Sequence, residues 1–116
     1  MIFAQSGTIK VAKENSTEIF GLQSNRSGFP LSYIVLIDEK KALFINSFDD
    51  ETTILRKYQE DEQIDGRIFH GMYKSERNQI YIFLNRGIQF KGSRVDDLLY
   101  LVDHTSEQVT FFKIHL

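Results

Sequence analysis

The sequence predicts a mainly β fold: an antiparallel meander forming a barrel or a strongly curled sheet, with one short helix near residues 51–60. Apolar runs of about four to eight residues, the usual length of strands, follow one another along the whole chain. Clusters of polar turn residues separate these runs. The length of 116 residues suits one hydrophobic core. We therefore expect residues 1–116 to form a single β domain.

The first third of the chain predicts short strands and one hairpin. Strands are expected at residues 8–12 and 18–22, with a polar turn at 13–17 between them. A polar stretch, 23–28, precedes the only proline, Pro30. Residues 31–37 read LSYIVLI, and residues 42–48 run back after the charged turn 38–41. Two such runs joined by a short polar turn predict a hairpin.

The short helix is predicted from a cap and from helical spacing. Asp49 and Asp50 precede the segment, and a carboxylate there accepts hydrogen bonds from the free backbone N–H groups of a first helical turn. Ile54, Leu55 and Tyr58 fall on one helical face. We expect a helix over residues 51–60 with one of the two aspartates as its cap.

From Gly66 onward the pattern is that of strands alone. The expected strands cover residues 67–74, 79–85, 88–91, 97–103 and 109–116, and the turns between them cover 75–78, 86–87, 92–96 and 104–108. Consecutive strands with such short connections form an antiparallel meander.

Several of these strands are apolar on both faces. Side chains alternate along a strand, so Ile80 and Ile82 share one face while Tyr81 and Phe83 share the other. A sheet with its back in water would carry polar residues at alternate positions, so something must cover the second face. A ten-residue helix spans only about 15 Å. A partner subunit, or a barrel with aromatic patches on its outside, would account for the remainder.

Aromatic residues are the main functional signal. The chain has 10 Phe and 5 Tyr, whose rings suit a cavity lining or an interface. The bulk of such residues in any protein belong to the core or to ordinary surface, so the signal lies in the set rather than in any single ring. As ligand- or partner-binding residues we expect Tyr81, Phe83, Tyr100, Phe112 and His70.

The C-terminal part of the chain resembles small lipocalin-like antiparallel barrels. The resemblance rests on a glycine before a strand, an alternating aromatic strand after a turn with Asn78, a later glycine and an aromatic closing strand. These features read Gly71-Met72-Tyr73-Lys74, Ile80-Tyr81-Ile82-Phe83, Gly92, Leu99-Tyr100-Leu101 and Val109-Thr110-Phe111-Phe112-Lys113-Ile114. The resemblance implies barrel architecture, with a small apolar ligand at the barrel mouth.

The cysteine content and the net charge of the chain exclude or disfavour several classes of function. The chain has no cysteine, which excludes disulfides, thiolate metal sites and thiol catalysis and fits a reducing compartment. A net charge of -2 lacks the positive field of a general nucleic-acid or anionic-membrane binder. The first residues lack the basic and long apolar segments of a leader, so we expect a cytoplasmic protein. An exported chain trimmed of its leader would read the same.

Candidate catalytic and metal-binding groups are weakly patterned. His70, His104 and His115 lack the close spacing of a metal site, and we expect no metal and no cofactor. The pairs Asp49-Asp50 and Asp96-Asp97 are interpreted as a helix cap and a turn, since adjacent strand residues point in opposite directions.

Two charged clusters also have ordinary interpretations. Glu60-Asp61-Glu62 with Asp65 is interpreted as a solvated acidic loop, or as a contact for a basic partner. Arg86, Lys91 and Arg94 with Phe83 and Phe90 have the composition of a stacking platform for single-stranded nucleic acid, but three positive charges in a near-neutral chain do not favour that function.

The sequence therefore predicts a non-enzymatic binding module that holds a small apolar ligand or a protein surface on aromatic strands. One alternative is a protein-interaction protein, either an immunity or neutralising partner or a self-associating subunit such as a homodimer. A second alternative is a hydrolase-like enzyme on a barrel scaffold. His70 is then the only plausible general base, and no second positioned group accompanies it.

Overall fold

The computed structural model describes residues 5–11, 17–22 and 31–115. Strands account for 64% of the described residues, which confirms the expected mainly β fold. The elements are β1 (Gln5–Ile9), β2 (Glu18–Leu22), β3 (Leu31–Ile37), β4 (Lys41–Ser47), α1 (Glu51–Gln59), β5 (Ile64–Glu76), β6 (Gln79–Leu84), the 3-10 turn η1 (Asn85–Gly87), β7 (Gln89–Val95), β8 (Leu98–Asp103) and β9 (Gln108–Ile114).

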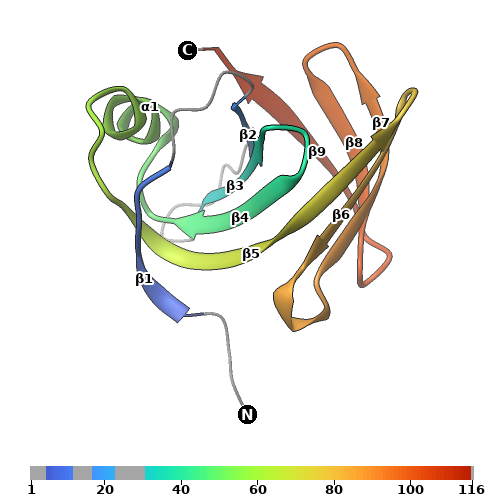
Figure 1. Cartoon of the computed structure of the whole chain (residues 1–116), viewed down its shortest axis with the longest axis horizontal. Helices are drawn as coiled ribbons and strands as arrows, with labels where there is room; N and C mark the ends of the chain where they lie inside the picture. The colour runs from blue at the N-terminus through green and yellow to red at the C-terminus, as the bar shows by residue number, and fades with distance from the viewer. Residues whose placement is uncertain (1–4, 12–16, 23–30, 116) are drawn as a thin grey trace.

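The strands β2 to β9 form a closed, eight-stranded, up-and-down antiparallel barrel (Figure 1). Each strand pairs with the next along the chain, and β9 returns to pair with β2 through Ile19 opposite Ile114. β1 adds to the edge of β5 outside this ring. Closure leaves the eight barrel strands paired on both sides, so the barrel wall has no free strand edge between them.

Large side chains occupy the barrel interior. Phe20 and Phe111 are at most 1% exposed, and Phe90 packs edge-on against Phe44 and Phe111 with ring centroids 5.1 and 6.1 Å apart. Eight strands enclose an interior just wide enough to be filled by side chains or to hold one small ligand. In this barrel the rings of Phe44, Phe90 and Phe111 pack against one another in that interior.

A second apolar cluster lies outside the barrel wall, under α1. Tyr33, Val35 and Ile45 point outward from β3 and β4 and pack with Ile54 and Tyr58 of the helix. In Figure 1 α1 lies on the side of the barrel away from β6, β7 and β8. Both faces of β3 are therefore apolar. One face packs in the barrel core, and the other packs against the helix.

The helix begins as the sequence predicts. The Thr53 backbone N–H donates a hydrogen bond to Oδ1 of Asp50 at 2.8 Å, so Asp50 is the cap. Asp49 has a different role, because its carboxylate pairs with Nζ of Lys57 at 2.7 Å. Its backbone carbonyl accepts a hydrogen bond from the Tyr33 hydroxyl at 2.8 Å. These contacts fix α1 against β3.

One predicted strand end was wrong. A strand was predicted to end at Lys91, with a turn over 92–96, but β7 continues through Val95. A Cβ at Gly92 would lie 1.9 Å from the carbonyl oxygen of Tyr100, so the glycine allows close approach of β8 rather than a turn. The turn falls at Asp96, whose φ is 54°.

Other strands match the expectation within a few residues. β2 and β3 have the predicted bounds, and β5 is longer than predicted at both ends. β1 lies at Gln5–Ile9 rather than at 8–12, and Ala12 lies outside the described residues. The expected turn at 13–16 and the polar stretch 23–28 with Pro30 also lie outside them.

Candidate functional site

The outer surface of β6 to β9 carries a group of half-exposed rings. Alternation along β6 sends Ile80 and Ile82 into the core, at most 1% exposed, and sends Phe83 outward, 50% exposed. On β8 and β9, Tyr100 and Phe112 point outward in the same way and are 46% and 42% exposed. We call this surface the aromatic face, defined by Tyr81, Phe83, Leu98, Tyr100, Val102 and Phe112.

The strand register places these residues on one sheet surface, with the polar outward side chains of β7, namely Gln89, Lys91 and Ser93, between those of β6 and those of β8. Lys91 on β7 lies between Tyr81 on β6 and Val102 on β8. Leu98 and Phe112 are opposite each other on β8 and β9. Side chains opposite each other on neighbouring antiparallel strands are about 5 Å apart, so these residues touch across the strands.

A hollow of about 280 Å³ opens in the aromatic face, and its lining residues come from β6, β7, β8 and the turn after β8. Tyr81, Phe83, Val102 and His104 line it together with Lys91. Asp103 also borders the hollow, but its carboxylate is engaged in its own turn, where it accepts hydrogen bonds from the Thr105 hydroxyl and from two backbone N–H groups. The hollow therefore has a mixed lining, in which the rings of Tyr81 and Phe83 lie beside polar side chains and beside one ammonium and one carboxylate group.

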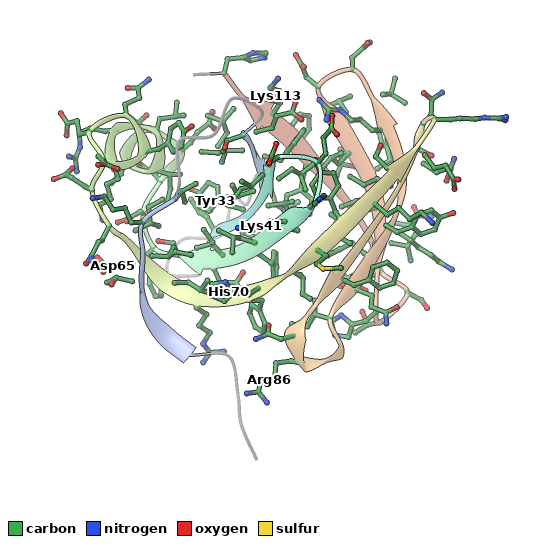
Figure 2. All side chains as sticks on the ribbon, in the orientation of Figure 1. Tyr33, Lys41, Asp65, His70, Arg86 and Lys113 are labelled. Carbon is green, nitrogen blue, oxygen red and sulfur yellow. The ribbon has the colours of Figure 1, made fainter. Side chains whose placement is uncertain are left out.

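The sequence-predicted residues divide into two groups. Tyr81, Phe83, Tyr100 and Phe112 all lie on the aromatic face. His70 lies apart on β5 (Figure 2): it is exposed, opposite Leu43 of β4, and it precedes by two residues Met72, which pairs with Phe83 at the border of the aromatic face. Its backbone N–H donates to Oδ1 of Asn85 at 3.2 Å.

Sequence reasoning missed one feature of this site. It assigned Lys91 only to a mixed basic and aromatic cluster, whereas the register places the lysine beside Tyr81 at the hollow. That mixed cluster is not assembled, because Phe90 points into the core and Arg94 lies over the Phe20 ring at 5.3 Å. The signal for Lys91 was its alternation with Phe90, which places neighbouring residues on opposite faces.

A compact ion-pair group joins the two halves of the barrel at one end. Arg94 of β7 donates two hydrogen bonds to the carboxylate of Glu18 on β2, at 2.7 and 2.5 Å, and Nζ of Lys113 lies 3.1 Å from the same carboxylate. The hydrogen bond from Arg94 lowers the pKa of Glu18 below its ordinary value of 4.5, and Lys113 acts in the same direction. Two cations satisfy one carboxylate here, an arrangement that serves barrel closure.

The remaining candidate groups are dispersed. In the described ranges no cluster of three His, Asp or Glu side chains is placed to hold a metal ion. Nε2 of His115 lies 3.1 Å from Asp97, and both side chains are well exposed. In the acidic loop, Arg56 pairs with Glu60 and Glu62. These are surface ion pairs of the ordinary kind.

Comparisons with models of protein families, with curated proteins and with solved structures gave no match. Among the described residues, no helix has the length and apolar character needed to cross a membrane. The features that bear on function are therefore the geometry of the barrel and its aromatic face.

Proposed function

We propose that this protein is a non-enzymatic binding module that docks its aromatic face on the surface of another protein. One observation carries the proposal: the rings of Phe83, Tyr100 and Phe112 stand 42–50% exposed on the outer surface of the neighbouring strands β6 to β9. Several large exposed rings on one face exceed the singly scattered apolar residues that are normal on a protein surface. Tyrosine and phenylalanine are enriched where proteins meet, since their rings bury much area with few rotatable bonds.

The packing of the barrel supports a protein surface over a small apolar ligand. Ring contacts among Phe44, Phe90 and Phe111 occupy the interior where a small-ligand barrel keeps its cavity. The proposed likeness to lipocalin-like barrels is thus one of architecture: eight strands in chain order that close on themselves. We also place the interaction in the cytoplasm, because a cysteine-free chain suits a reducing compartment.

The proposal also accounts for the tyrosines of the aromatic face. A tyrosine that served only the core would need a buried partner for its hydroxyl, as Tyr33 finds in the Asp49 carbonyl. Tyr100 instead points outward and is 46% exposed. Its hydroxyl is free to hydrogen-bond with water or with a partner while the ring supplies apolar area.

Site-specific photo-crosslinking in the cells that make the protein tests this function. A photoreactive phenylalanine analogue replaces Phe83 in one variant and Phe48 in another; Phe48 is 75% exposed and lies outside the aromatic face, so it is a matched control. We expect a discrete adduct with one protein from position 83 and none from position 48. The same adducts from both positions, or adducts from neither, would contradict the proposal.

A further inference from the structure

The charges of the aromatic face have one sign near its centre. Lys74 of β5 and Lys91 of β7 lie on either side of Tyr81 in the strand register, and both are exposed. Within the part of the chain that the structure describes, neither lysine enters an ion pair. The outward acidic residue in this register, Glu76, lies at the far end of β5 beside the turn to β6. The face therefore presents two unneutralised ammonium groups among aromatic rings.

The size of the hollow indicates what kind of group enters it. At about 280 Å³ it lies just below the range of about 300–1,000 Å³ that is typical of small-molecule pockets. One large apolar side chain of a partner would fill it against Tyr81, Phe83 and Val102. The rim carries the Lys91 ammonium and the Asp103 carboxylate, whose Oδ1 accepts three hydrogen bonds within its own turn. With Lys74 on the other side of Tyr81, ammonium groups outnumber carboxylates around the hollow.

Resting on the function proposed above, we infer that the partner is an acidic apolar protein segment. Its apolar side chain enters the hollow, and a neighbouring carboxylate pairs with Lys91. A second copy that offers the same face fits less well, because the polar side chains beside its rings are mainly lysine, glutamine and serine, which supply few carboxylates to pair with Lys91.

Peptide titrations followed by backbone amide NMR test the charge preference. The probes are three short capped peptides in which one phenylalanine is flanked by aspartates, by serines or by lysines. We expect the aspartate peptide to shift the amides of Tyr81, Lys91 and Val102. It should bind about three- to fivefold more tightly than the serine peptide, as suits one partly exposed ion pair.

Charge reversal supplies the decisive comparison. Lys91→Glu should remove the preference for aspartate and create one for the lysine peptide. The matched control is Lys40→Glu, which reverses an exposed lysine in the β3–β4 turn outside the aromatic face and should leave the preference unchanged. Amide shifts of the barrel core report whether each variant keeps its fold.

The outcomes separate this inference from the function on which it rests. Equal binding of the aspartate and serine peptides, unaltered by Lys91→Glu, would overturn the acidic partner and leave a protein-binding face in place. Amide shifts that appear on concentrating the protein without peptide would assign the face to a second copy and overturn the inference. Absence of any shift at the face with all three peptides would also overturn it. The crosslinking experiment judges the binding function independently.

Discussion

On both sides of this barrel the strands place apolar side chains on their outward as well as their inward faces. The outward side chains are buried on one side and partly exposed on the other. On one side, the outward residues of β3 and β4 include Val35 and Ile45, which pack with α1 and are about 1% exposed. On the other, the outward residues of β6 to β9 include four aromatic rings, and Phe83 remains 50% exposed. A strand that is apolar on both faces therefore does not by itself show whether its outward face is buried by another segment of the same chain.

Residue type makes the distinction. Branched aliphatic side chains gain only from burial, and the fold buries them beneath its own helix. Tyr81, Tyr100 and Lys91 keep a polar end that water can solvate, whereas Phe83 and Phe112 have no polar end and still stand about half exposed. The side under α1 is thus part of the apolar core, and the aromatic face is the side for which we propose a binding function.

The largest expected effect comes from a substitution that forces β7 and β8 apart beneath the aromatic face. In Gly92→Ala, the new methyl group would meet the Tyr100 carbonyl oxygen at 1.9 Å, so β7 and β8 must separate. We expect unfolding to become easier by at least about 3 kcal/mol, or the variant to fail to fold. Gly7→Ala is the control, because nothing lies within 4 Å of its added Cβ. Equal midpoints of urea unfolding for the two variants would contradict the close approach.

A pair of truncations compares the two sides directly. Ile54→Ala removes a helix side chain that is 1% exposed and should cost about 2–5 kcal/mol. Phe83→Ala removes a larger side chain that is 50% exposed and should cost less than about 1 kcal/mol. Chemical denaturation of both variants measures the difference. Similar costs would mean that the aromatic face supports the fold as much as the helix does.

Lowering the pH should weaken the ion pairs of Glu18 with Arg94 and Lys113, which join β2 to β7 and β9. Because the folded-state pKa of Glu18 is lowered, its ion pairs with Arg94 and Lys113 add stability above the ordinary pKa of 4.5. This contribution disappears as the pH falls through the folded-state pKa. Glu18→Gln should cost roughly 1–3 kcal/mol at neutral pH, and its unfolding free energy should change less than that of the parent below pH 4.5. Parallel pH profiles for the two proteins would contradict this role.

The smallest effect concerns the hairpin on the covered side. Asp38 and Glu39 both have positive φ, at 51° and 63°, a conformation that costs energy in residues with a Cβ. Glu39→Gly should therefore raise the unfolding free energy by about 0.5 kcal/mol, since relief of strain exceeds the entropic cost of glycine. A drop in the thermal midpoint would show that the turn is not strained.

The strands and helix were predictable from sequence because their signals are local. Alternation placed Tyr81 and Phe83 opposite Ile80 and Ile82, and the carboxylate of Asp50 marked the helix start. Gly92 was misread because a glycine in a turn and a glycine under a neighbouring strand look alike in sequence. Closure of β9 on β2, the Glu18–Arg94 pair and the lysine at the hollow depend on residues distant along the chain, which no local pattern reports.

The central claim is that the aromatic face serves binding rather than folding. Its most direct test measures both the stability and the protein crosslinking of one variant. Phe83→Ser, Tyr100→Ser and Phe112→Ser are introduced together, with a photoreactive amino acid at position 102 in both this variant and the parent. We expect the triple variant to remain folded, to lose only about 1–2 kcal/mol of unfolding free energy, and to lose its crosslinked protein adduct in cells. An unfolded triple variant, or a folded one that keeps the parent's adduct, would contradict a face kept for binding rather than for the fold.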